Sequence, residues 1–149
     1  MGLNSISSFQ VEAAETADRA LIVVVEDNPT DVFMIREAIT SYGLNADLET
    51  MEDGQTAVDF IERIDADEST LCPSLMLLDI NLPRTDGFAV LERLRRSKRC
   101  ADVPVIMMTS SATRADRTKA TDLGTDVYFQ KPCGYDAFIK IGDIIGNLL

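Results

Sequence analysis

Two short runs of apolar residues constrain the fold more than any other feature of the chain. Leu21 to Val25 and Leu75 to Leu78 are continuous, without the alternation that marks a strand with one face in water. Strands of this kind are buried on both faces, which is typical of parallel sheets covered by helices. We therefore expect an α/β protein.

The spacing of apolar residues alternates between short runs and helical repeats from residue 20 onward, as βα units require. A doubly wound parallel sheet with strand order 2-1-3-4-5 would place its site outside the carboxyl ends of strands 1 and 3, where the winding reverses. The predicted strands lie near 21–25, 46–50, 74–79, 104–109 and 127–131, and the predicted helices near 30–42, 54–66, 87–97, 113–122 and 136–147.

One domain accounts for residues 20–149, and residues 1–19 precede it as an N-terminal extension. The sequence has no apolar stretch of membrane-spanning length and no signal-peptide pattern, so we expect a cytoplasmic protein without membrane contact. A formal net charge of -11 opposes direct DNA binding.

A local basic run lies on the third predicted helix, and we interpret it as a solvated face. It comprises Arg93, Arg95, Arg96, Lys98 and Arg99.

Cysteine and histidine usage excludes several kinds of site. Cys72, Cys100 and Cys133 are odd in number and widely spaced, so we predict free thiols rather than a disulfide framework. The chain has no histidine, which argues against a zinc site and excludes a role as a histidine kinase or histidine phosphotransfer protein.

Polar side chains follow four of the predicted strands. Glu26 and Asp27 close the first strand, Asp79 the third, Thr109 the fourth and Lys131 the fifth. Because the carboxyl ends of parallel strands meet at one edge of a sheet, we expect these side chains to converge. Three converging carboxylates repel one another, and a divalent cation relieves that cost.

The ligands available at this edge are oxygens, which suit Mg²⁺. We predict that Asp27 and Asp79 bind the ion directly, that the backbone carbonyl of Asn81 adds a third oxygen, and that Glu26 acts through water.

A cation, an ammonium and a hydroxyl together suit phosphoryl transfer, whose transition state spreads negative charge over equatorial oxygens. Lys131 would supply the ammonium and Thr109 the hydroxyl. Asp79 stands alone at a strand end between them, so it is the predicted nucleophile, forming an aspartyl phosphate.

The ordered set of motifs resembles the receiver domain of two-component response regulators over about residues 20–148. The motifs are Glu26-Asp27, Asp79-x-Asn81-x-Pro83-x-x-Asp86-Gly87, Thr109-Ser110-Ser111 and Lys131-Pro132. The run from Glu26 to Asp31, the Pro83-Arg84 pair and the lack of an output domain look most like stand-alone receivers paired with bacteriophytochrome kinases.

The resemblance implies a flavodoxin-like (βα)5 fold and a Mg²⁺-dependent transfer of a phosphoryl group to Asp79 from the phosphohistidine of a sensor histidine kinase. It also implies that the Thr109 hydroxyl turns toward the phosphate while Tyr128 moves inward behind it. The Lys131–Pro132 peptide bond is expected to be cis. Ser110 departs from the more common alanine of the family.

The signal is expected to leave by contact with a downstream protein or a phosphotransfer protein. The apolar last helix and the ending Leu148-Leu149 favour a homodimer, although the same residues also suit a core.

Three alternatives differ in their site chemistry. A phosphatase of the haloacid dehalogenase class needs a second acid where this chain has Asn81. A flavodoxin-like nucleotide or flavin binder needs a glycine-rich loop after the first strand, where this chain has Glu26-Asp27-Asn28-Pro29. A phosphorylation-independent docking module would keep the fold without the chemistry.

Overall fold

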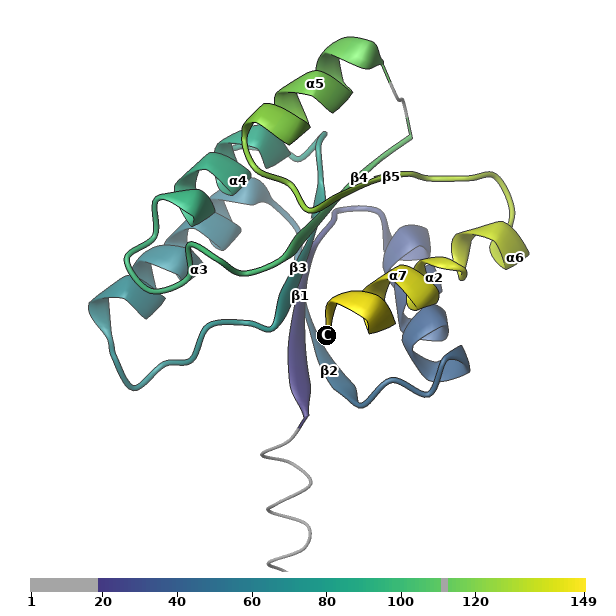
Figure 1. The fold of residues 1–149 in the computed structure, drawn as a ribbon, viewed down its shortest axis with the longest axis horizontal. Coiled ribbons are helices and arrows are strands. Elements are labelled where there is room, and N and C mark those ends of the chain that lie inside the picture. The colour runs from purple at the N-terminus through teal and green to yellow at the C-terminus, as the bar shows by residue number, and fades with distance from the viewer. Residues whose placement is uncertain (1–18, 111–112) are drawn as a thin grey trace, which may run out of the picture.

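A parallel five-stranded sheet in the order β2-β1-β3-β4-β5 forms the centre of the computed structural model, which describes residues 19–110 and 113–149 (Figure 1). The strands are β1 (Ala20–Val25), β2 (Ala46–Met51), β3 (Leu75–Asp79), β4 (Val105–Thr109) and β5 (Val127–Gln130). The described helices are α2 (Pro29–Ser41), α3 (Gly54–Ala66), α4 (Gly87–Arg95), α5 (Arg114–Asp122), α6 (Tyr135–Phe138) and α7 (Ile141–Leu148). The predicted strand order is confirmed. The N-terminal extension lies outside the described residues except for Arg19.

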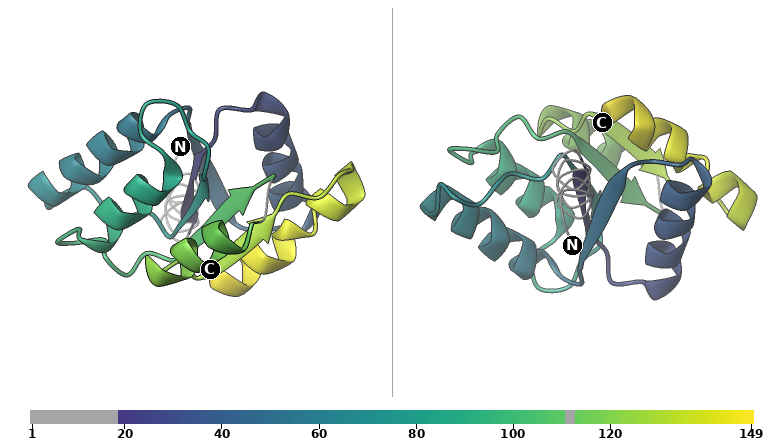
Figure 2. Two further views of the ribbon diagram at one scale, coloured as in Figure 1. Left: turned by 90° about the horizontal axis from the view of Figure 1, so that it is seen from above. Right: turned by 90° about the horizontal axis from the view of Figure 1, so that it is seen from below.

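The helices cover both faces of the sheet, with α3, α4 and α5 on one side and α2, α6 and α7 on the other (Figures 1 and 2). Each side holds one apolar core cluster. Residues of β1 alternate between the two clusters, with Val23 and Val25 in one and Ile22 and Val24 in the other. The continuous apolar runs of the sequence therefore serve two cores at once.

Four helices begin at a side chain that accepts a hydrogen bond from a main-chain N–H of the first turn. The capping residues are Asn28 of α2, Asp53 of α3, Asp86 of α4 and Thr113 of α5. Each cap satisfies a donor that has no partner within the helix. The cap at Asn28 fixes the start of α2 directly after the acidic end of β1, and the cap at Asp86 fixes the start of α4 at the end of the loop that follows β3.

The predicted last helix is divided into α6 and α7 at Ile139 and Lys140. The Gly142 N–H donates to the Ile139 carbonyl at 2.9 Å and the Asp143 N–H to the Lys140 carbonyl at 3.1 Å, so the chain tightens to 3₁₀-type bonds there.

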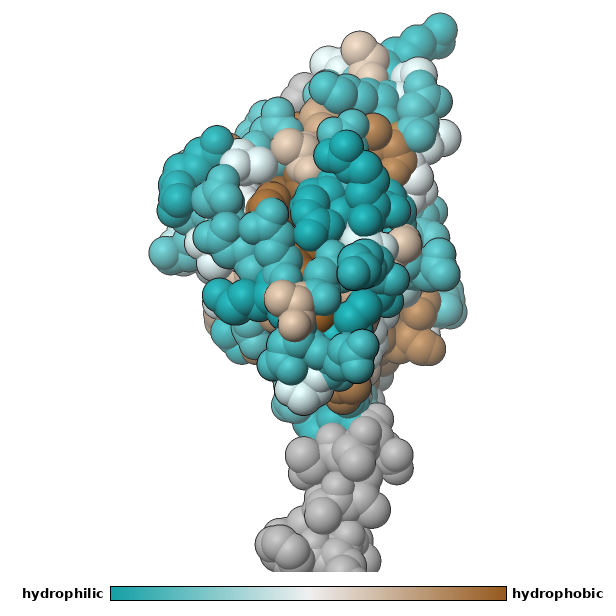
Figure 3. All heavy atoms as spheres, turned by 90° about the vertical axis from the view of Figure 1, so that its left-hand side faces the viewer, coloured by the Kyte–Doolittle hydropathy of each residue, from teal (hydrophilic) through white to brown (hydrophobic). Residues whose placement is uncertain are grey.

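The apolar face of the last helices belongs to the core, since Phe138, Ile141 and Ile145 are buried. Leu149, the last residue, is 43% exposed and lies outside this face. The pattern that favoured a homodimer is therefore explained by core packing. The surface seen from the side of α3 and α4 is largely hydrophilic, with small separate hydrophobic patches (Figure 3).

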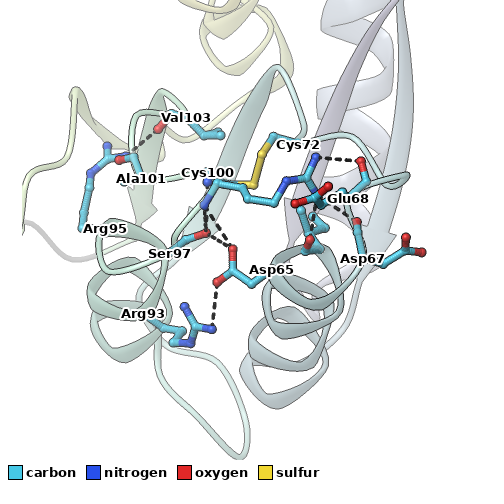
Figure 4. The surroundings of a disulfide bond; sticks show 12 residues. Asp65, Asp67, Glu68, Cys72, Arg93, Arg95, Ser97, Cys100, Ala101 and Val103 are labelled. Atoms are coloured by element: carbon cyan, nitrogen blue, oxygen red, sulfur yellow. Dashed lines mark hydrogen bonds and ion pairs between the residues drawn. A yellow bond between two sulfur atoms is a disulfide. The ribbon is translucent and has the colours of Figure 1, made fainter.

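The prediction of three free thiols is wrong for two of them. Cys72, which precedes β3, and Cys100, which precedes β4, form a disulfide with a Cα–Cα distance of 5.7 Å (Figure 4). The two residues are 28 positions apart, and the fold, not their spacing, brings them together at the amino end of neighbouring strands. Cys133 is free and exposed.

The interpretation of the basic run as a solvated face is wrong for Arg93, Arg95 and Arg99, whose guanidinium groups bind main-chain carbonyls or carboxylates. Arg95 donates to the carbonyls of Ala101, Val103 and Gly124 at 2.6 to 3.0 Å and pairs with Asp126. These contacts of Arg95 satisfy main-chain carbonyls and a carboxylate in the region of the disulfide (Figure 4).

The other two arginines act between α3 and α4. Arg99 donates to the carbonyl of Ile64 in the last turn of α3 and to those of Asp67 and Glu68 just beyond it. Arg93 pairs with Asp65 at 3.1 Å. These bonds join α4 and the segment that follows it to the carboxyl end of α3.

Within the described residues, no helix is both long and apolar enough to cross a membrane.

Candidate functional site

Three carboxylates meet at the carboxyl ends of β1 and β3, as the sequence predicted. One oxygen from each of Glu26, Asp27 and Asp79 lies within 4.8 Å of the others. Parallel pairing of Val25 with Leu78 places the residues that follow, Glu26 and Asp79, at the same level. Glu26 is 1% exposed and Asp79 6% exposed, whereas Asp27 is exposed.

The loop after β3 holds Asp79 by close backbone packing. The Asn81 N–H donates to Asp79 Oδ1 at 3.3 Å, and the Gly87 N–H donates to the Ile80 carbonyl at 2.9 Å. A Cβ atom at Gly87 would lie 2.1 Å from the Asp79 carbonyl oxygen, so only glycine permits this approach. The Asp86 cap and Gly87 therefore bring the start of α4 against the strand end that carries the carboxylate.

Lys131 reaches the same site from the end of β5. Its Nζ lies 2.7 Å from Glu26 Oε1 and 3.5 Å from Asp79 Oδ2. The Lys131 side chain is 8% exposed, so these contacts are shielded from water. A hydrogen bond of 2.7 Å from the Lys131 N–H to the Thr109 carbonyl fixes the backbone of β5 beside β4.

Asp31, which was not predicted from the sequence, belongs to the site by its contact with Lys131. It lies in the first turn of α2, and its Oδ2 is 2.7 Å from Lys131 Nζ. The available signal was weak, because an acid in the first turn of a helix is explained by the helix dipole alone. Its burial, at 9% exposure, separates it from an ordinary first-turn acid.

Burial and ion pairing shift two pKa values at the site. Desolvation of the carboxyl, together with the negative charge of Asp79, raises the pKa of Glu26 to about 7 against the opposing hydrogen bond from Lys131. Burial alone would lower the pKa of Lys131, but hydrogen bonds to Asp31 and Glu26 and the charge of Asp79 raise it above its ordinary value. The Lys131 ammonium therefore stays charged, and Glu26, Asp31 and Asp79 all pair with it.

Thr109 and Tyr128, the two residues of the predicted switch, lie on the neighbouring strands β4 and β5. Thr109 ends β4 and is fully buried. Tyr128 on β5 packs against the cluster under α3, α4 and α5, and the Arg117 guanidinium lies 4.7 Å from its ring centroid. The Tyr128 hydroxyl is buried and has no hydrogen-bond partner among the described residues, a costly arrangement for a polar group. Burial raises the pKa of that hydroxyl.

The Lys131–Pro132 peptide bond is trans, and the prediction of a cis bond is wrong, since none of the peptide bonds in residues 19–110 and 113–149 is cis. The trans form of a bond before proline is favoured by about 0.5–1 kcal/mol. Lys131 reaches Glu26 and Asp31 from the trans bond, so these contacts do not require the cis form.

The donor set fits a hard divalent cation. Carboxylate oxygens converge from the ends of β1 and β3. Because Asp27 is exposed, water molecules could reach an ion bound there and complete its coordination. Glu26, Asp27 and Asp79 are the residues that would hold such an ion.

Comparisons with known proteins agree with this geometry. The family model of the response regulator receiver domain matches residues 22–141. The probable methanogenesis regulatory protein FilR2 of Methanothrix harundinacea is 30% identical over 125 residues, covering 84% of this chain and 80% of that protein. Several other curated relatives are longer, and the chain spans 42 to 43% of their length.

Two solved structures of stand-alone response regulators are similar throughout. The phosphorylated cyanobacterial phytochrome response regulator RcpA is 27% identical with a TM-score of 0.78, covering 87% of this chain and 92% of that one. The Mn²⁺-bound form of Rcp1, a response regulator of Synechocystis, is 26% identical with a TM-score of 0.76, covering 86% and 92%. Receiver domains of this kind interact with histidine kinases, and phosphorylation on aspartate is typical of them. Because the family model covers most of the chain, the chain belongs to the response regulator receiver domain family.

Proposed function

We propose that this receiver domain accepts a phosphoryl group on Asp79. The observation that carries the proposal is the position of the Asp79 carboxylate, buried at a strand end between two acids and the ammonium of Lys131. In the transfer, an Asp79 oxygen attacks phosphorus, the P–N bond to the donor imidazole breaks, and the imidazole leaves as the nitrogen base. The protein thus serves as a signalling phosphoacceptor whose chemistry is confined to its own phosphorylation and dephosphorylation.

The proposed cofactor is Mg²⁺, held by Asp27 and Asp79, by the Asn81 carbonyl, and by Glu26 through water. A divalent ion neutralises phosphoryl oxygens when bound. The convergence of the three carboxylates and the Mn²⁺-bound form of the similar Rcp1 support this assignment. The all-oxygen donor set favours Mg²⁺ over softer metals.

Lys131 and Thr109 are the proposed partners of the phosphoryl oxygens, and Tyr128 is the proposed second element of the switch. Lys131 is already within 3.5 Å of Asp79. Because the Tyr128 hydroxyl has no partner within residues 19–110 and 113–149, a conformation that gives it a hydrogen bond would be favoured, which supports this assignment.

The proposed donor is a sensor histidine kinase, and the similarity to RcpA makes a bacteriophytochrome a candidate. Output by contact with a downstream or phosphotransfer protein, self-association as a homodimer and a cytoplasmic location stay predictions.

The proposal is tested by incubating the protein and its Asp79→Asn variant with acetyl phosphate, with and without Mg²⁺. We expect the intact mass to gain one phosphate, in an alkali-labile linkage, only with Asp79 and Mg²⁺ present. No adduct here or with phosphorylated histidine kinases would leave a phosphorylation-independent docking module as the function.

A further inference from the structure

Lys131 is bound more closely by two acids than by the proposed phosphoryl acceptor. An ammonium has three donors. Two contacts of 2.7 Å go to Glu26 Oε1 and Asp31 Oδ2, while the Asp79 oxygen lies at 3.5 Å. In the described residues, every ion pair of these three acids is made with this one lysine.

The fold places Asp31 where it can make this contact. The Asn28 side chain accepts from the Thr30 N–H at 2.9 Å and fixes the first turn of α2, from which Asp31 faces the end of β5. When the side-chain atoms alone are counted, Asp31 is 13% exposed and Lys131 is 8% exposed, so the contact is largely shielded from water. A buried ion pair of this kind is held by strong hydrogen bonds, because water cannot replace either partner.

We propose that Asp31 is a positioning residue that restrains Lys131 and thereby lowers the affinity of the Asp79 site for a phosphoryl group. The Asp31 carboxylate neutralises part of the ammonium charge that an incoming phosphoryl group would otherwise receive. This role of Asp31 rests on the proposed function, because it regulates the affinity of the same site for a phosphoryl group.

The test measures binding of beryllofluoride, formed from beryllium and fluoride, to the full chain at saturating Mg²⁺ by NMR titration. Asp31→Asn keeps an oxygen acceptor of the same size and removes the charge. We expect the variant to bind about tenfold more tightly, since the resting state loses one charge-assisted contact. Tightening is not an effect of damage to the fold, which would weaken the site.

Two controls separate this restraint from a general loss of charge. Glu37→Gln removes one charge from the same helix at a residue that contacts Tyr135 rather than Lys131, and its Kd should equal the wild-type Kd within about twofold. In a Lys131→Gln background, Asp31→Asn should change the Kd by less than about threefold, because its effect acts through the lysine.

The outcomes are distinct. An Asp31→Asn protein that binds no more tightly than Glu37→Gln, or an equal tightening in the Lys131→Gln background, overturns the inference and leaves the proposed function standing. A wild-type protein that takes up neither beryllofluoride nor phosphate overturns the proposed function itself. If Asp31→Asn did not fold, Asp31→Ser would be measured against the same criteria.

Discussion

The two edges of the sheet handle charge in opposite ways. At the amino edge, Arg95 satisfies three main-chain carbonyls and one carboxylate beside a disulfide, and Asp65 accepts from Ser97 at 2.6 Å and pairs with Arg93. At the carboxyl edge, Glu26 and Asp79 share a single ammonium with Asp31.

The pKa values of two acids express this difference. The pKa of Asp65 is lowered to about 2, chiefly by the hydrogen bond from Ser97. The pKa of Glu26 is raised to about 7, chiefly by burial. One edge is neutralised internally and contributes to stability, whereas the other is short of positive charge and is suited to binding a cation.

The largest expected effect breaks the carboxyl edge. Lys131→Met should slow phosphorylation of Asp79 by acetyl phosphate about 10²–10³-fold, the usual cost of removing one electrostatic donor from a transition state. The rate would be followed by intact mass at saturating Mg²⁺. Lys140→Met, a lysine on the turn before α7, is the matched control, and equal rates for both variants would contradict a role for Lys131.

The next effect breaks the amino edge alone. Cys72→Ser with Cys100→Ser should lower the free energy of unfolding by about 3.5 kcal/mol, the chain-entropy expectation for the loop that the disulfide closes. Urea unfolding measures this, with Cys133→Ser as the control that leaves the pair intact. The phosphorylation rate should change less than about twofold. A large loss of rate would mean that the two edges are coupled.

Arg95→Ala sharpens the comparison within the amino edge. It leaves the carbonyls of Ala101, Val103 and Gly124 without their donor and should cost about 2–3 kcal/mol of unfolding free energy. The control is Arg96→Ala, because the Arg96 side chain is 70% exposed and its pair with Glu92 is long, at 3.5 Å. Similar losses for both variants would show that the carbonyl contacts contribute little.

The smallest effect is a dependence on pH. The folded state lowers the pKa of Asp65 from its ordinary value of 3.8 to about 2, so this carboxylate stabilises the protein above pH 3.8 and the contribution is lost as the pH falls toward 2. Asp65→Asn should cost about 1–2 kcal/mol at neutral pH, and this cost should shrink as the pH falls from 3.8 through about 2. Exposed Asp59→Asn on the same helix is the control, and a pH-independent cost would contradict the assignment.

The sheet and the acidic pocket could be predicted because both follow from local patterns. Continuous apolar runs identify strands, and a residue directly after a parallel strand must lie at the carboxyl edge. Glu26, Asp27 and Asp79 were therefore found without knowledge of any contact.

The amino edge could not be predicted because its partners are distant in sequence and generic in kind. Arg95 and Arg99 bind main-chain carbonyls, which every residue has, so no pattern identifies them. The Cys72–Cys100 pair depends on the neighbouring starts of β3 and β4. Asp31 was missed for a related reason, since its partner lies 100 residues away.

Helix α5 differs from the other long helices in how it is held. Its buried residue is Ala120 alone, and two of its cations lie over rings, Arg117 over Tyr128 and Lys119 over Phe88. Such contacts have no fixed register, because a cation can slide across a ring face while it stays attracted to it. Helix α5 therefore buries fewer side chains against the sheet than α3 and α4, which have five buried residues each, so we expect it to be the helix of this face that shifts at the lowest cost.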